Sequence, residues 1–287
     1  MEADTRLGVP AGPLRGHVAY HGYDLRGALP GTHRGLPSPS LTLVVTFGEP
    51  LTMLDATGTP ITRRSVLGGL HTVAETIVHR GRQSGVHVVL DPLAARALLG
   101  RPAAELHGVT ADTDAVLGAA GRELAERVDA ADGWDARFAA LDTVLGRAMA
   151  RAPRPTVADE VRHAWRRLVG SGGRTGVRDL ADEVGWSDRH LGQRFRAELG
   201  VGPKAAARMA RFDVARRRLA GRAAAGHPLA LAELAADAGY ADQAHLAREF
   251  RDFAGCSPTR WIAEEIVAGE IGNVQDALTP EDPGWAP

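Results

Sequence analysis

The feature that most constrains this chain is an internal repeat in its last third. Leu180-Ala-Asp-Glu-Val-Gly185-Trp186 recurs as Leu234-Ala-Ala-Asp-Ala-Gly239-Tyr240, at an offset of 54 residues. Further matches follow at an offset of 55, pairing Leu191, Phe195, Gly200 and Pro203 with Leu246, Phe250, Gly255 and Pro258. Because the offset grows by one, the second copy has one extra residue in its turn. The chain therefore contains one supersecondary unit twice.

Each copy has the residues that a helix-turn-helix requires. A glycine, Gly185 or Gly239, can adopt the left-handed conformation that ends the first helix without a penalty from a Cβ atom. An aromatic residue follows, and then Ser187 or Asp242 can accept a hydrogen bond from the first amides of the second helix. The apolar residues of the second helices predict their buried faces: Leu191, Phe195 and Leu199, and Leu246, Phe250 and Phe253. The pattern predicts two helix-turn-helix units.

The expected buried faces determine which side chains point outward from the two second helices. These are Arg189, Gln193 and Arg196 in the first copy, and Ala244, Arg248 and Arg251 in the second, with Gln243 and His245 at its start. Arginine and glutamine can form paired hydrogen bonds with guanine and adenine edges, and arginine also neutralises phosphates. Each residue alone is equally compatible with a solvated helix surface. The two faces together favour binding to duplex DNA.

The segment between the copies, Lys204 to Leu219, has no Gly or Pro and predicts a helix. Its sixteen residues, at about 1.5 Å each, give a rod of about 24 Å. Such a rod could hold two recognition helices about one DNA turn, roughly 34 Å, apart. Arg216-Arg-Arg218 near its end has two interpretations of equal weight: contacts to phosphates, or a cationic last turn that complements the helix dipole.

This ordered pattern resembles the AraC/XylS family of bacterial transcription regulators over about Val161 to Trp261. The matching positions are Leu180-Ala, Gly185, Ser187, Leu191, Phe195, Leu199-Gly200, Pro203, Arg211, Ala215, Leu234-Ala, Gly239-Tyr240, Asp242-Gln243, Leu246, Phe250, Gly255 and Ser257-Pro258. The resemblance implies DNA contacts at Arg189, Gly192, Gln193, Arg196, Gln243, His245 and Arg248. Ala206 and the pair His245-Leu246 stand where the family usually has aromatics, which weakens one packing contact and leaves base preference open.

Charge and composition agree with this interpretation. The net charge is −1, but residues 161–262 hold 18 basic against 11 acidic residues, or +7, and the remainder carries −8. No apolar run approaches the roughly 18 to 20 residues of a membrane span, and Met1 to Pro13 lacks the pattern of a secretory signal. We therefore expect a cytoplasmic protein that does not contact a membrane. The single cysteine, Cys256, excludes an intramolecular disulfide and a cysteine-based zinc site.

The remaining sequence predicts an α+β, multidomain chain. Residues 1–150 would form an N-terminal sensor or dimerisation domain, with strands to about residue 91 that include Leu41 to Phe47 and Val86 to Leu90, and helices after them. Two prolines place a linker at 151–156. The double helix-turn-helix domain, all-α with a long connecting helix, would occupy 157–265, and 266–287 would be a frayed tail.

The N-terminal half resembles, more weakly, the sensor domains of such regulators. The residues that carry this are Gly85-Val-His-Val-Val-Leu-Asp-Pro92, then Ala94-Ala-Arg-Ala-Leu-Leu-Gly100 and Ala103-Ala-Glu-Leu106. The resemblance implies a small β-barrel or sandwich over Gly16 to Leu90, with dimerising helices from Val116 to Met149. One helix is expected around Leu93 to Leu98 and another over Val116 to Val128. The apolar stripe Trp134, Phe138, Leu141 and Leu145 suits packing within the domain equally well, and we favour that alternative.

The sequence offers little support for catalysis. Six of the 11 histidines lie in the β-rich part, at positions 17, 21, 33, 71, 79 and 87, but their spacing does not match a metal site. Cys256 lacks the partner cysteines of the DNA-repair methyltransferases that share an AraC-like unit, and no hydrolase elbow, phosphate loop or dinucleotide fingerprint is present. We therefore expect no catalytic residue, cofactor or metal.

The sequence thus predicts a transcription regulator that binds specific double-stranded DNA. Further candidate partners are an unknown small-molecule effector, RNA polymerase and a second copy of the chain. Two other functions stay open: a small-molecule or metal-dependent barrel enzyme fused to a DNA-binding domain, and a scaffold that acts through protein contacts alone.

Overall fold

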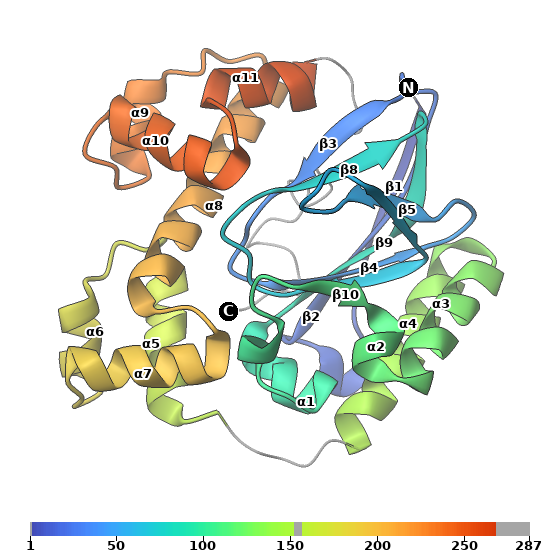
Figure 1. Cartoon of the computed structure of the whole chain (residues 1–287), viewed down its shortest axis with the longest axis horizontal. Coiled ribbons are helices and arrows are strands. Elements are labelled where there is room, and N and C mark those ends of the chain that lie inside the picture. The colour runs from blue at the N-terminus through green and yellow to red at the C-terminus, as the bar shows by residue number, and fades with distance from the viewer. Residues whose placement is uncertain (1, 152–156, 268–287) are drawn as a thin grey trace.

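The N-terminal half of the chain is built from ten antiparallel strands. The computed structural model describes residues 2–151 and 157–267 and is shown in Figure 1. The strands are β1 (Glu2–Gly8), β2 (Val18–Arg26), β3 (Gly31–Gly35), β4 (Leu41–Thr46), β5 (Leu51–Leu54), β6 (Pro60–Arg63), β7 (Ser65–Gly68), β8 (Glu75–His79), β9 (Arg82–Leu90) and β10 (Thr110–Asp112).

These strands form two sheets that face each other. One sheet has the order β1-β2-β9-β4-β7-β10 and the other the order β3-β8-β5-β6. Figure 1 shows β3 and β8 in one layer and β4 and β9 in the other. Both β4 and β9 match the expected strands, because their β-branched runs pair in the centre of the larger sheet. The N-terminal half is therefore a β-sandwich.

Helices cover the larger sheet, and all except η1, which lies between β1 and β2, follow β9 in the chain. They are η1 (Gly12–Leu14), η2 (Pro92–Ala94), α1 (Ala95–Leu99), η3 (Ala103–Leu106), α2 (Thr113–Leu117), α3 (Ala119–Ala130) and α4 (Gly133–Arg151). The prediction of a single helix over Val116 to Val128 is wrong, since this segment belongs to two helices, α2 and α3. Gly118 adopts a positive φ of 60° and separates α2 from α3, because the left-handed conformation it can reach at little cost breaks the helical path.

The apolar stripe of α4 packs inside the N-terminal domain, as we favoured. Phe138 stacks on Tyr20 with ring centroids 5.9 Å apart, and Trp134 meets Phe47 at 5.6 Å. Gly22 lies beneath Trp134 so closely that a Cβ atom there would come within 2.5 Å of the indole. The stripe is therefore occupied by the chain's own sheet and is not left open for a second copy.

The C-terminal half is helical. Its elements are α5 (Asp159–Gly170), α6 (Val177–Glu183), α7 (Asp188–Leu199), α8 (Pro203–Ala224), α9 (Leu231–Asp237), α10 (Gln243–Ala254), α11 (Pro258–Ile262) and η4 (Ala263–Val267). The α+β architecture predicted from the sequence is therefore confirmed. Within the described residues, no helix is long and apolar enough to cross a membrane.

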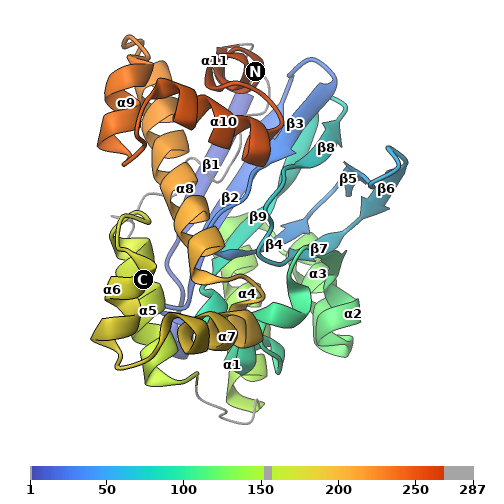
Figure 2. The ribbon, with the colours of Figure 1, turned by 60° about the vertical axis from the view of Figure 1, so that its left-hand side comes forward.

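The connecting helix α8 is longer than the sequence pattern indicated. It contains 22 residues and continues past Gly221, because one glycine lowers helix stability by only about 1 kcal/mol relative to alanine. At about 1.5 Å per residue, α8 measures about 33 Å. Figure 2 shows it running between the α6–α7 pair and the α9–α10 pair. The expected linker at 151–156 and tail at 266–287 lie outside the described residues, except that Arg151 is the last residue of α4 and residues 266–267 belong to η4. The domain boundaries stay predictions.

Candidate DNA-binding surface and ligand pocket

Both helix-turn-helix units form as the repeat predicts. Gly185 and Gly239 have φ values of 70° and 81°, in the left-handed region that ends α6 and α9. The Ser187 hydroxyl accepts a hydrogen bond from the His190 amide at 3.2 Å, and an oxygen of Asp242 accepts one from the His245 amide at 2.7 Å. These N-caps satisfy backbone donors that the helix itself leaves unpaired. The same local chemistry therefore positions α7 and α10.

The two units bury the side chains that the apolar pattern indicated. Leu191, Phe195 and Leu199 of α7 are fully buried, and Phe195 lies 6.4 Å from Trp165 of α5. In the second unit, Phe250 and Phe253 of α10 each lie 5.0 Å from the ring of Phe212 on α8. Because the inner face of each helix is occupied in this way, its opposite face is directed to the surface.

The surface of α7 presents three of the four predicted contact residues. Arg189, Gln193 and Arg196 are exposed. Gly192 is buried, so the prediction that it lies on the outward face of α7 is wrong. The side chain of Arg196 folds back over it and donates a hydrogen bond from Nη1 to the Gly192 carbonyl at 3.3 Å. A residue without a side chain cannot reach past that guanidinium.

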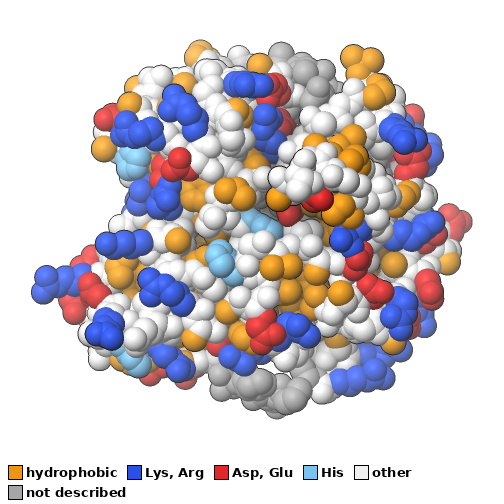
Figure 3. Space-filling model, viewed as in Figure 1, with side chains coloured by type: hydrophobic (Ala, Val, Ile, Leu, Met, Phe, Trp, Pro, Cys, Tyr) orange, Lys and Arg blue, Asp and Glu red, His pale blue; other side chains and the backbone are white. Residues whose placement is uncertain are grey.

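The surface of α10 presents Gln243, Arg248 and Arg251, all exposed, whereas His245 is half-buried. The imidazole of His245 lies edge-on to Tyr240 with ring centroids 5.1 Å apart. In the first unit, His190 meets Trp186 in the same way at 4.6 Å, and His190 is exposed. Sequence reasoning missed His190, although its offset of 55 residues from His245 matches the repeat. Figure 3 shows Lys and Arg side chains on the part of the surface where these helices lie.

The three arginines near the end of α8 are already engaged by the chain. Arg216 is only 1% exposed, and its Nη2 donates to Asp213 at 2.7 Å. Arg217 pairs with the same carboxylate at 2.7 Å, and Arg218 donates to the Asp237 carbonyl at the end of α9. Burial contradicts a phosphate contact for Arg216, because a buried guanidinium cannot reach a DNA backbone. The helix-dipole interpretation also fails for it, since α8 continues to Ala224.

Among the described residues, two arginines of the N-terminal half form ion pairs with the C-terminal half. Arg96 of α1 binds Glu198 of α7 through paired hydrogen bonds of 2.7 and 3.0 Å. Arg34 of β3 binds η4: its guanidinium donates to Glu265 and to Glu264, each at 2.7 Å, and its backbone amide donates to Glu265 at 3.1 Å. The Glu265 side chain is 1% exposed, whereas those of Arg34 and Glu264 keep 22% and 35% of their exposure, so only the Glu265 side of this second contact is shielded from solvent.

An apolar contact reinforces the junction at α7. Gly200, which ends α7 with a φ of 79°, lies against His107 and Ala104 of the N-terminal half. A Cβ atom at Gly200 would come within 2.4 Å of the His107 Cβ. The position therefore requires glycine for its backbone conformation and also for the close approach of the two halves.

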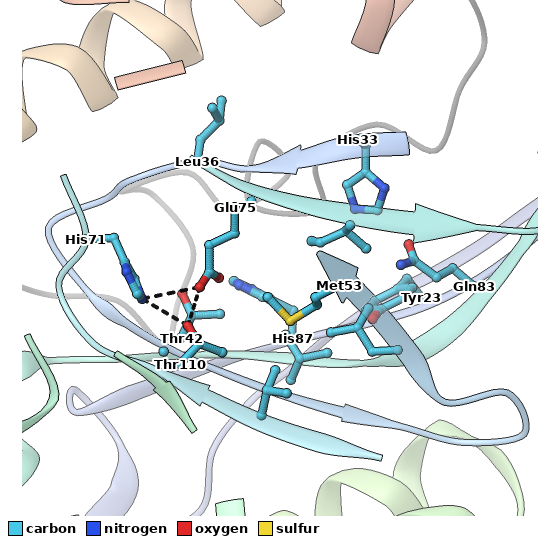
Figure 4. A pocket seen from close by; sticks show the side chains of 16 residues that line it. Tyr23, His33, Leu36, Thr42, Met53, His71, Glu75, Gln83, His87 and Thr110 are labelled. Carbon is cyan, nitrogen blue, oxygen red and sulfur yellow. Dashed lines mark hydrogen bonds and ion pairs between the residues drawn. The ribbon is translucent and has the colours of Figure 1, made fainter. Parts of the chain in front are cut away.

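A cavity of about 80 Å³ lies between the two sheets of the sandwich, shown in Figure 4. A water molecule needs about 10 to 15 Å³ by this measure, so the space accommodates one small organic molecule. Its apolar lining comes mainly from Leu36, Val44, Leu51, Met53, Val66 and Ile77. Glu75, His71 and Thr110 are grouped at one side, and His33, Tyr23 and Gln83 at the other.

Burial keeps the histidines of the cavity neutral. Desolvation, with a smaller contribution from His79, lowers the pKa of His33 to about 3. Desolvation, with contributions from His21 and Arg216, lowers the pKa of His87 to about 3. The pKa of His71 is lowered too, mainly by desolvation, although Glu75 opposes the shift. The Thr110 hydroxyl donates to Glu75 at 2.5 Å and lies 3.1 Å from His71 Nε2.

The six N-terminal histidines do not assemble into a metal centre. The rings of His33 and His79 lie 5.7 Å apart, and His21 pairs with His87 across β2 and β9. In the part of the chain that the structure describes, no group of three or more His, Cys, Asp or Glu side chains is placed to hold a metal ion. The alternative of a metal-dependent barrel enzyme therefore has no donor set among these residues.

The fold and these surfaces define a class of protein: a double helix-turn-helix DNA-binding domain beside a ligand-sized cavity in a β-sandwich. Residues 180–264 match the family model of a helix-turn-helix domain of the AraC type. This match confirms the AraC resemblance for the C-terminal domain and supports a DNA-binding transcription regulator. A comparison with curated proteins finds no match.

Several solved structures resemble the chain weakly. The crystal structure of ToxT from Vibrio cholerae O395 shares 10% identity, covers 85% of this chain and 97% of its own, and gives a TM-score of 0.48. Wild-type ToxT of strain SCE256, solved with an unsaturated fatty acid bound, shares 11% identity over 86% of this chain and 95% of its own, with a TM-score of 0.46. A cupin superfamily protein from Desulfitobacterium hafniense DCB-2 shares 11% identity over 31% of this chain and 77% of its own, with a TM-score of 0.24.

Proposed function

We propose that the chain is a sequence-specific regulator of transcription that binds double-stranded DNA with α7 and α10, under the control of a small molecule held in the sandwich cavity. The observation that carries the proposal is the repeated unit. Two recognition helices with exposed Arg and Gln side chains are joined by one helix of about 33 Å, close to the roughly 34 Å of one DNA turn. In this proposal, residues 1–150 form the domain that senses the effector and residues 157–265 form the domain that binds DNA. Residues 151–156 are the linker between the two domains.

The exposed side chains divide into two roles. Arg189 and Gln193 on α7, and Gln243 and Arg248 on α10, lie in the first two turns of each helix and would read base edges in the major groove. Arg196 and Arg251 lie in the last turn and would contact phosphates. His245 would contribute through the edge of its ring that Tyr240 leaves uncovered. Gly192 makes no contact in this scheme.

Effector control would act through the contacts that join the two halves. His33 lines the cavity, and the next residue, Arg34, binds Glu264 and Glu265 after the second unit. A ligand that shifts β3 would therefore change how that contact holds η4. A ligand controls DNA binding only if it prefers one arrangement of the halves, so the expected mechanism is a population shift between docked and released arrangements.

The test is to select DNA fragments with the purified full-length chain, sequence them, and measure affinity for the selected site at several salt concentrations. Specific binding should weaken steeply as salt rises, because phosphate contacts release counterions. Arg248→Ala should cost about 1 to 3 kcal/mol of specific affinity and relax preference at one base pair. Arg122→Ala on α3 removes an exposed arginine of the N-terminal half and is the matched control. No selected motif, or equal binding by both variants, would contradict the proposal.

A further inference from the structure

The charged side chains that line the sandwich cavity determine which class of ligand it can bind. None of the 16 described residues that line it is Lys, Arg or Asp, and Glu75 is the only acidic one. The three histidines of the lining are neutral at physiological pH, because burial lowers the pKa of each. The cavity wall therefore carries a single negative charge beside an apolar interior.

The Glu75 carboxylate is held in place and oriented toward the cavity. It accepts a hydrogen bond from the Thr110 hydroxyl at 2.5 Å, and His71 Nε2 lies 3.9 Å from it. Its side chain keeps 28% of its exposure. Within the described residues, no lysine or arginine forms an ion pair with it, so the acid is left for a cation from outside the chain. Figure 4 shows Glu75 extending from β8 between His71 and Met53.

A second polar group, His33, lies on the same face of the smaller sheet as Glu75. His33 is 6% exposed, lines the cavity from β3, and its Nδ1 has no hydrogen-bond partner in the described structure. His33 pairs with Ile77, two residues along β8 from Glu75, so the two polar residues are diagonal neighbours on one face of the sheet. Diagonal positions on a sheet lie about 7 to 8 Å apart, so one small molecule can contact both side chains. A buried polar atom without a partner is costly, and a ligand's hydrogen bond would relieve that cost.

We propose that the cavity binds a small arylalkylamine, with the ammonium group on Glu75 and the aromatic body against Met53, Leu51 and Ile77. An added hydroxyl at the far end of the ring would meet His33. Carboxylates and phosphates are excluded, since they would meet the Glu75 charge in an apolar wall with no cation to compensate. This inference deepens the proposed function by naming the effector class, and it rests on that function only for its regulatory consequence.

The test compares three probes that share one body: 2-phenylethylamine, 2-phenylethanol and phenylacetate. Calorimetry on the full-length chain without DNA should rank the amine above the alcohol, with phenylacetate not binding. Glu75→Gln keeps an acceptor for Thr110 but removes the charge. This variant should bind the amine about tenfold or more weakly, because a charge-assisted hydrogen bond becomes a neutral one. Its affinity for the alcohol should not change. Glu49→Gln, an exposed carboxylate outside the cavity, is the matched control and should change neither.

Three outcomes would overturn the inference: tighter binding of phenylacetate than of the amine, equal loss for amine and alcohol in Glu75→Gln, or no binding of the amine at millimolar concentration. Thermal denaturation of Glu75→Gln without ligand shows whether the variant is folded, and Thr110→Val offers a second variant that disorders the carboxylate without removing it. Because calorimetry is done without DNA, failure here leaves the DNA-binding result standing. Failure of DNA selection would equally leave the ligand result intact.

Discussion

The two helix-turn-helix units have the same local structure but are attached differently to the N-terminal half. The first unit is held directly: Arg96 binds Glu198 near the end of α7, and His107 covers Gly200 just beyond it. The second unit packs α10 on α8, α9 and α11, and η4 then carries the contact to Arg34. A duplicated motif therefore yields two similar exposed helix faces, while the contacts around it attach each unit differently to the N-terminal half.

This difference matters because the two attachments begin at different parts of the sandwich. Arg34 lies on β3, whose neighbouring residues His33 and Gly35 line the cavity. Arg96 lies on α1 and does not line the cavity, whereas His107 lies near the lining residue His71, whose pKa it lowers. Because Arg34 is adjacent in sequence to two lining residues, we expect a ligand to act first on the second unit. The predictions below test this contrast.

The largest effect is expected from breaking the core of the second unit alone. Phe250 is fully buried between Phe212 and Trp261, with centroid distances of 5.0 and 6.0 Å. Phe250→Ala should lower the free energy of unfolding by about 3 to 5 kcal/mol, through lost burial and the cavity left behind. Chemical denaturation measures this. Arg251→Ala, on the exposed face of the same helix, is the control and should change stability by less than about 0.5 kcal/mol.

Acid should lower the free energy of unfolding through two buried histidines, His33 and His87. The pKa of His33 and of His87 is about 3 in the folded chain, against 6.5 for an ordinary histidine. In the unfolded chain these two histidines therefore become protonated below pH 6.5, whereas in the folded chain they stay neutral until about pH 3. The contribution of the neutral histidines to the free energy of unfolding should be fully present above pH 6.5. Between pH 6.5 and about pH 3, the free energy of unfolding should fall by about 1 kcal/mol per pH unit for each histidine.

Two variants separate this effect from general acid denaturation. Burial and the neighbouring His79 lower the pKa of His33, and burial, His21 and Arg216 lower that of His87, so each of these causes opposes protonation. His33→Gln should make the pH dependence of unfolding shallower below pH 6.5, as followed by urea titrations at several pH values. His227→Gln changes an exposed histidine and should leave the slope as it is. An unchanged slope in His33→Gln would refute the assignment.

The smallest effect is expected at the attachment of the first unit. Arg96 and Glu198 are 29% and 12% exposed, so their pair is partly screened by solvent. Arg96→Ala should therefore lower stability by only about 1 kcal/mol or less. If the pair restrains α7, the same variant should raise DNA affinity without a ligand, measured by fluorescence anisotropy on the selected site. Arg101→Ala, another arginine of this region with an exposed partner, is the control. Equal DNA affinity in both variants would show that the contact does not restrain the helix.

Local signals in the sequence predicted the second half of the molecule well. Gly185, Gly239, Ser187 and Asp242 act through their own backbone or the nearest turn, so their roles could be inferred without knowing what packs against them. The stripe from Trp134 to Leu145 was also recognisable, because helical periodicity is a short-range pattern. The break at Gly118 was missed, since a single glycine does not show from sequence whether it will take a left-handed conformation.

The double helix-turn-helix, its N-caps and most of its exposed Arg and Gln side chains can be predicted from the sequence, because they depend on contacts within a few turns of helix. Local sequence does not indicate the burial of Arg216, which lies beside Asp213 and His87 in the folded chain. The cavity likewise depends on strand register, which places His33 opposite Ile77 and diagonal to Glu75. Such contacts are made between segments far apart in the chain, so no local pattern encodes them.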